Sequence, residues 1–142
     1  MRNGRNKAKL IITETDHGRL RDLIERNRIA GTESPWALLV LEQQLDNAQI
    51  VPSREVPDDV VTMRSKVRVR SENDQAPAEY TIEYPHDADP DQGSVSILTP
   101  LASAVLGERS GEEVAWNLAA GVVRYEIGPI LYQPEAAGHF DQ

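Results

Sequence analysis

The sequence predicts an α+β protein in which a short antiparallel helical hairpin is followed by an antiparallel sheet that carries one short helix. Three observations lead to this prediction. Apolar residues recur at helical spacing before Pro52, they alternate with polar residues after Pro57, and a segment that begins with proline and ends at Gly107 has the length of one short helix. Because helices come first and strands follow, a parallel βαβ sheet is not expected. The predicted parts are a disordered basic arm at 1–8, the hairpin at 9–52 and the sheet domain at 53–142.

The first helix is predicted from about residue 15 to Gly31. Leu20, Leu23 and Ile24 stand at positions i, i+3 and i+4 with charged residues between them, which is the spacing of one apolar helix face. The residues just before this helix, 9–13, fit either a short strand or the approach to the helix. Three residues are candidates for its N-cap: Thr13, Thr15 and Asp16.

The second helix has a clearer start, because Ser34 is a good N-cap and Pro35 occupies the first helical position, where no N–H is needed. Its apolar stripe consists of Leu38, Leu41, Leu45 and Ala48, and Pro52 is predicted to end the element. Two helices joined by so short a connection run antiparallel. A helix of about 15 residues gives an arm of only roughly 22 Å.

Two strands with opposite charges are predicted after Pro57. In 63–70 apolar residues alternate with cations, and in the strand that follows the loop 71–77 acids occupy one face. Such a basic stripe could bind an acidic ligand, but the two rows would face each other across a hairpin, so mutual neutralisation is the favoured interpretation. The cations are Arg64, Lys66, Arg68 and Arg70, and the acids are Glu79 and Glu83.

The rest of the chain is predicted to complete the sheet. A strand at 94–98 leads into a helix with Thr99 as N-cap, Pro100 at the first position and Gly107 at the end. Strands around 114–118 and 123–127 form a hairpin. The tail after Pro134 is expected to be loose.

Composition and charge narrow the classes of function. The 142 residues include no cysteine, and no apolar run is long enough for a signal peptide or a membrane span, so a cytoplasmic location is expected. Residues 1–70 carry 13 Lys and Arg against 10 Asp and Glu, whereas residues 71–142 carry 2 against 13. The strong negative charge of residues 71–142 disfavours sequence-specific binding of nucleic acid and suits a basic protein partner.

No motif in the chain supports catalysis, a metal or another cofactor. The loop 86–93 has acids at calcium-loop spacing, but Gln92 and Leu98 stand where glycine and a bidentate glutamate are required, so a solvated turn is expected. The three histidines are far apart in sequence, and no nucleophile or phosphate-loop motif is present. Trp36 and Trp116 are expected in the core, although an exposed Trp36 near the hairpin tip would be a good contact anchor.

A resemblance to known proteins begins at residue 94. The segment 94–107, SVSILTPLASAVLG, reads as a strand, a Thr-Pro-Leu corner and a helix that ends in glycine, and 111–121, GEEVAWNLAAG, reads as a strand with a glycine turn. With 125–127 as the closing strand, this order resembles the C-terminal, FKBP-like domain of the Gre transcript-cleavage factors. The hairpin is much shorter than the Gre coiled coil. With the runs 45–49 LDNAQ, 57–63 PDDVVTM and 132–138 YQPEAAG, the chain resembles the regulator of nucleoside diphosphate kinase (Rnk) family.

The resemblance implies a partner, the RNA polymerase core enzyme, bound near its secondary channel in competition with Gre factors. It implies that the strand-to-helix corner makes the polymerase contact, here Leu98, Thr99, Pro100 and Leu101. Gre factors hold a catalytic metal with an acidic pair at the tip of the coiled coil. The corresponding tip here, with Arg28, Glu33 and Trp36, has one acid, so it cannot supply two carboxylates to magnesium.

The expected function is therefore a non-catalytic regulator. Two enzymatic alternatives remain open on the sequence. Gre-like stimulation of transcript cleavage is disfavoured by the short arm and the single tip acid. Prolyl isomerisation is suggested by fold resemblance alone, and its aromatic-lined pocket is hard to build when Phe140, in the tail, is the single phenylalanine.

Overall fold

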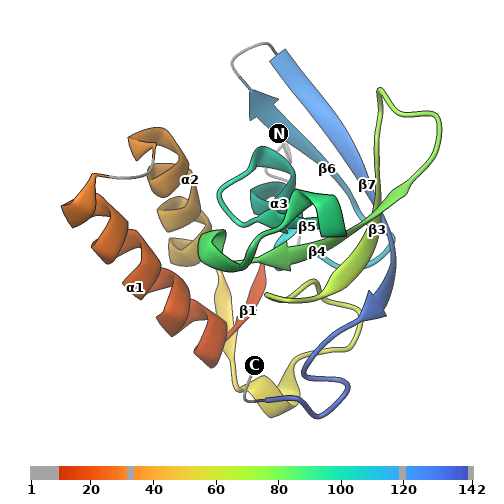
Figure 1. Cartoon of the computed structure of the whole chain (residues 1–142). Coiled ribbons are helices and arrows are strands. Elements are labelled where there is room, and N and C mark those ends of the chain that lie inside the picture. Colours follow the sequence, from red (N-terminus) through yellow and green to blue (C-terminus); the bar gives the residue numbers. More distant parts are fainter. Residues whose placement is uncertain (1–9, 32–33, 119–120, 141–142) are drawn as a thin grey trace.

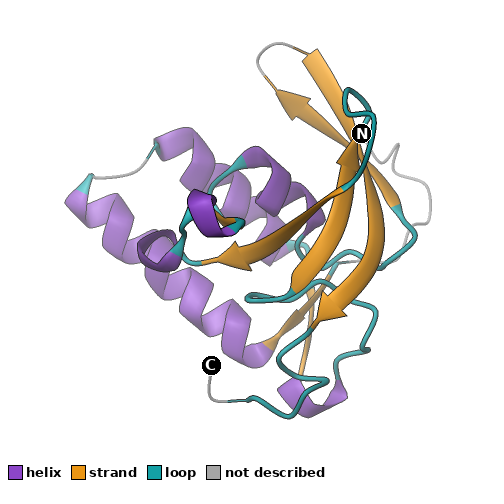
Figure 2. Ribbon diagram, turned by 45° about the vertical axis from the view of Figure 1, so that its right-hand side comes forward, coloured by secondary structure: helices purple, strands orange, loops and turns teal. Residues whose placement is uncertain are grey.

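The computed structural model describes residues 10–31, 34–118 and 121–140. Three helices gather on one side of a five-stranded sheet (Figures 1 and 2). The predicted arm at 1–8 lies outside the described residues. In chain order the elements are β1 (Ile11–Thr13), α1 (Glu14–Ala30), α2 (Pro35–Asp46), β2 (Gln49–Val51), the 3₁₀ turn η1 (Ser53–Glu55), β3 (Lys66–Ser71), β4 (Ala78–Glu83), the 3₁₀ turns η2 (Pro85–Asp87) and η3 (Pro90–Gln92), β5 (Ser94–Ser96), α3 (Pro100–Val105), β6 (Glu113–Leu118) and β7 (Gly121–Tyr132).

Helix α1 confirms the first helical prediction and selects Thr13 as its N-cap. The Thr13 hydroxyl accepts the backbone N–H of Asp16 at 3.1 Å, which satisfies one donor of the first turn. At the other end Gly31 adopts φ 69°, and its N–H donates to the Asn27 carbonyl at 2.8 Å. The helix buries Leu20, Leu23 and Ile24, as their spacing predicts.

Helix α2 begins as predicted and ends earlier than predicted. The Ser34 hydroxyl accepts the Ala37 N–H at 3.4 Å, and Leu38, Leu41 and Leu45 are buried. The helix stops at Asp46, because the next residues leave it to form β2, which pairs in parallel with β1. The hairpin is therefore closed at its base by a two-stranded ladder, which the sequence analysis did not predict.

The main sheet has the order β5-β4-β3-β7-β6. Its pairs are antiparallel except β4–β5, which is parallel and departs from the expected all-antiparallel sheet. Strand β3 starts at Lys66 and not at residue 63, because 62–65 forms a tight turn in which the Ser65 N–H donates to the Thr62 carbonyl at 3.0 Å. Arg64 is the third residue of that turn, with φ 67°.

The predicted neutralisation of the cation row is confirmed. Arg68 bonds Glu79 at 3.0 Å and Lys66 lies 3.6 Å from the same carboxylate across the β3–β4 hairpin. Arg70 is paired at 3.2 Å with Glu126, on the other neighbouring strand, β7. These contacts are exposed, so each contributes little to stability. Together they neutralise the row of basic side chains on this strand.

One hydrophobic cluster joins the hairpin to the sheet. It includes Leu20 and Leu41 from the hairpin, Ile82 and Ile127 from the sheet and Val105 from α3, all of them fully buried or nearly so. Trp116, which was expected in the core, is half-buried and packs against this cluster without being a buried member of it. The hairpin is thus part of the same folded body as the sheet.

Hydrogen bonds at Gln133 and Glu135 hold the start of the tail against the domain, which corrects the expectation that the described residues after Pro134 are loose. The Gln133 amide donates to the carbonyls of Pro57 and Val60, both at 2.8 Å. Glu135 accepts a hydrogen bond from the Thr62 hydroxyl at 2.8 Å. The sequence showed no signal for these contacts because every partner is more than 70 residues away.

At Gly107 a side chain would be unfavourable for two reasons: the backbone conformation and close contacts with neighbouring atoms. Its φ is 80°, and an added Cβ would lie 3.1 Å from Leu10 Cβ and 3.2 Å from the Ile11 carbonyl oxygen. We expect Gly107→Ala to lower the free energy of unfolding by about 2 kcal/mol or more, measured by urea denaturation.

Gly31→Ala is the matched control. Its φ of 69° is similar, but among the described residues no atom beyond its neighbours in the chain and its own helix backbone lies within 4 Å of the added Cβ, so only the conformational cost of about 1 kcal/mol applies. If Gly107→Ala and Gly31→Ala lowered the free energy of unfolding equally, the argument from close contacts at Gly107 would be contradicted.

Candidate functional site

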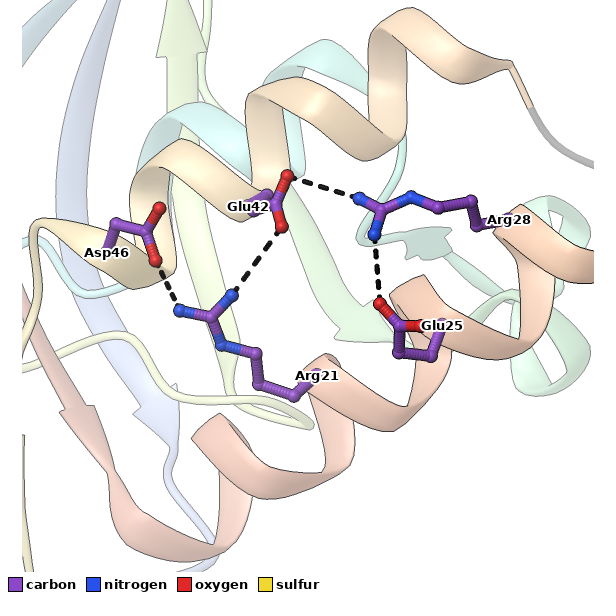
Figure 3. Close-up of polar contacts among 5 residues, drawn as sticks. All are labelled: Arg21, Glu25, Arg28, Glu42 and Asp46. Atoms are coloured by element: carbon purple, nitrogen blue, oxygen red, sulfur yellow. Dashed lines mark hydrogen bonds and ion pairs between the residues drawn. The ribbon is translucent and has the colours of Figure 1, made fainter.

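Ion pairs fix the two helices of the hairpin to each other (Figure 3). Arg21 of α1 bonds Asp46 of α2 and lies 3.8 Å from Glu42. Nearer the hairpin tip, Arg28 bonds Glu42 at 3.1 Å and Glu25 at 2.9 Å. Each pair is partly exposed and modest in energy, yet the set orients the tip. Arg28, a predicted tip residue, is therefore engaged within the hairpin.

The hairpin tip presents large apolar side chains. Ile29 is 83% exposed and Trp36 is 69% exposed, so the expectation of a core Trp36 is wrong and the contact-anchor alternative fits its position. Trp36 points outward because it lies on the face of α2 opposite Leu38 and Leu41. Glu33, the third predicted tip residue, lies outside the described residues. The exposure of Ile29 was missed by sequence reasoning.

The strand-to-helix corner is held by hydrogen bonds to Ser96. The Thr99 hydroxyl donates to the Ser96 carbonyl at 2.7 Å, and the Leu98 N–H donates to the Ser96 hydroxyl at 3.1 Å. Thr99 occupies the N-cap position of α3, but its side chain makes no cap hydrogen bond, which corrects the predicted role. The Thr99 hydroxyl instead forms its hydrogen bond with the preceding turn, at the Ser96 carbonyl.

The same corner offers a mixed surface. Pro100 is exposed, and Leu98 and Leu101 are half-buried against the core. Helix α3 lies beside α2, where the Gln44 amide donates to the Ser103 carbonyl at 3.1 Å (Figure 1). The two predicted contact regions, the corner and the hairpin tip, therefore belong to neighbouring helices.

A buried carboxylate connects α1 to the turn before β3. Asp16 is 5% exposed and accepts the Met63 N–H at 3.0 Å. Burial raises the pKa of Asp16 to about 7, although the Met63 hydrogen bond lowers it. Glu135 raises this pKa further, whereas Arg19 and Thr13 lower it. Sequence reasoning considered Asp16 only as a cap.

The described residues contain no group of three or more His, Asp or Glu side chains placed to hold a metal ion. In the acidic loop, Asp87 bonds Arg64 at 3.1 Å, and the Asp89 carboxylate accepts the Asp91 N–H at 3.2 Å. Within the described ranges, no helix has both the length and the apolar character needed to cross a bilayer.

Comparison with protein families defines the class. The sequence model described as "Transcription elongation factor, GreA/GreB, C-term" matches residues 56–132, so the chain belongs to this family. A solved structure titled "Prokaryotic transcription elongation factor GreA/GreB from Nitrosomonas europaea" is 37% identical and has a TM-score of 0.68. The match covers 89% of this chain and 100% of that chain.

Two relatives that match most of this chain narrow the class of protein further. The regulator of nucleoside diphosphate kinase of Escherichia coli (strain K12) is 35% identical over 136 residues, which are 95% of this chain and 98% of that protein. The transcription elongation factor GreA of a Nitratiruptor species is 29% identical over 123 residues, 84% of this chain and 74% of that protein. Within the GreA/GreB class, the chain is a member of the Rnk family, as the sequence resemblance predicted.

Proposed function

We propose that this protein is a cytoplasmic, non-catalytic transcription regulator that binds core RNA polymerase near the secondary channel and competes there with Gre factors. The observation that carries the proposal is the GreA/GreB C-terminal match over residues 56–132, which includes the corner at 98–101. Because a fold alone does not define a function, the proposal also depends on the surface that this corner presents.

The chemistry of the hairpin tip supports binding without catalysis. The segment 28–36 contains one acid, Glu33, and the described tip side chains that stand out are the apolar Ile29 and Trp36. An apolar anchor of this kind contributes to a protein interface, whereas a catalytic magnesium ion needs several oxygen ligands. Helix α1 has 17 residues, a length of about 26 Å, which limits how far the tip reaches.

The test is binding of the purified protein to core RNA polymerase, with GreA as competitor and a stalled elongation complex present to report transcript cleavage. We expect competitive binding without cleavage. Failure to bind would overturn the proposal, and stimulated cleavage would overturn its non-catalytic part.

Two surface variants locate the contact. Pro100→Lys places a cation on the exposed corner and Trp36→Ala removes the tip anchor, and we expect each to weaken binding about tenfold without unfolding the chain. Pro52→Lys, at an exposed proline near the base of the hairpin, is the control and should bind as the parent does. Equal binding by all three variants would exclude both surfaces.

A further inference from the structure

A groove of about 530 Å³ runs along the side of α1 that faces away from the ion pairs with α2. Its walls include Arg19 and Arg26 from α1, Arg64 from the turn before β3, and Tyr84 and His86 after β4. No acidic side chain is among the described residues that line it. Its volume falls in the range of small-ligand sites. In a protein of net charge −8, this gathering of basic side chains indicates an anionic ligand.

The arginines of α1 fall into two sets. Arg21 and Arg28 face α2 and are bonded to its acids. Arg26 lies on the groove side, and its guanidinium bonds the Asp22 backbone carbonyl at 3.4 Å, with no ion pair to another described residue. Its charge is thus available to a ligand. Arg19 lines the same groove nearer the start of the helix, beside the Tyr84 phenol. Burial raises the pKa of Tyr84, and the neighbouring Arg19 guanidinium lowers it.

The opposite wall is built from a strained arginine and two stacked rings. Arg64 holds φ 67°, a conformation that costs a non-glycine residue stability. Its guanidinium lies 5.2 Å from the Tyr84 ring centroid and also bonds Glu83 and Asp87, so its charge is partly neutralised.

His86 supplies a surface for a planar group. Its ring stacks on Tyr84 at a centroid distance of 6.4 Å and an interplanar angle of 29°, and its side chain is 78% exposed. Its outer face is therefore free to stack on a base, a contact common in nucleotide recognition.

We propose that this groove binds a nucleotide with two or more phosphates. Arg19 and Arg26 are seven residues apart, which is about 10 Å along the helix axis. Two long side chains at this separation can bind a polyphosphate together more readily than they can both reach a single phosphate. The base stacks on His86. None of the described residues that line this site is among the proposed polymerase contacts at the corner and the hairpin tip.

The test is calorimetric titration of the full-length protein with ADP, adenosine and inorganic pyrophosphate. We expect ADP to bind at least about tenfold more tightly than either of the other two, because only ADP uses both walls. No binding of ADP, or adenosine binding as tightly as ADP, would overturn the proposal. Pyrophosphate binding as tightly as ADP would overturn its nucleotide part and leave a simple anion site.

Matched variants test the assignment of residues. Arg26→Gln removes an exposed groove cation, and we expect it to weaken ADP binding about tenfold. Arg28→Gln, two residues along the same helix but facing α2, should change binding less than about twofold. His86→Ala should weaken binding of ADP and leave that of pyrophosphate unchanged. Equal effects of the two arginine variants would contradict the proposed site.

Discussion

Replacing Leu41 by alanine is expected to lower the free energy of unfolding by about 3–4 kcal/mol, which for a domain of this size is a large part of its stability. Leu41 is fully buried in the cluster that joins the hairpin to the sheet. Truncation removes its apolar contacts and leaves a cavity inside this shared core. Urea denaturation followed by circular dichroism measures the loss.

The control is Leu39→Ala on the same helix. Leu39 is 43% exposed, so its truncation should cost less than about 1 kcal/mol. Because the hairpin and the sheet share one core, both variants should unfold in a single transition. Two separate transitions, with the sheet unaffected by Leu41→Ala, would show that the hairpin is an independent arm.

The second large effect is a dependence of stability on pH that comes from Asp16. An aspartate in the unfolded chain has a pKa near 4, whereas burial raises the pKa of Asp16 to about 7 in the folded protein. Between these values the folded state keeps a proton that the unfolded state has lost. The free energy of unfolding therefore falls as pH rises from about 4 to 7, by up to ~4 kcal/mol from this residue.

Asp16→Asn separates this contribution from other titrations. Asparagine keeps the size of the side chain and an acceptor for the Met63 N–H, but it does not ionise. The variant should match the parent near pH 4, apart from a constant offset, and become increasingly more stable than the parent up to about pH 7.

Asp22→Asn, at an exposed position of the same helix, is the control and should leave the pH profile unchanged. Parallel stability curves for the parent and Asp16→Asn between about pH 4 and 7 would contradict the raised pKa.

Local signals were sufficient for the helices and most of the sheet. Ser34 with Pro35 marked the start of α2, Gly31 marked the end of α1, and the alternation around Lys66 and Tyr80 marked β3 and β4. These signals work because caps, proline and residue periodicity act within one or two turns of chain.

The candidate sites were predicted less completely. The corner at 98–101 was named from a family resemblance, and Trp36 was also considered as an exposed anchor near the hairpin tip. The role of the corner and of the tip residues Arg28, Glu33 and Trp36 as polymerase contacts stays a prediction. The groove along α1 was not found, because its walls come from positions as distant in sequence as Arg19 and His86. The sequence contains the arginines of α1, but nothing local shows which of them face α2.

By itself, the sequence determined the two helices of the hairpin, the order of the elements from β3 to β7, the family, and the acidic second half of the chain. Only the tertiary structure decided the parallel pairing of β1 with β2, the burial of Asp16, the exposure of Trp36 and the packing of the tail through Gln133. These features depend on contacts between residues far apart in the chain. Such contacts form only when the shared core brings distant segments together, so no short stretch of sequence carries their signal.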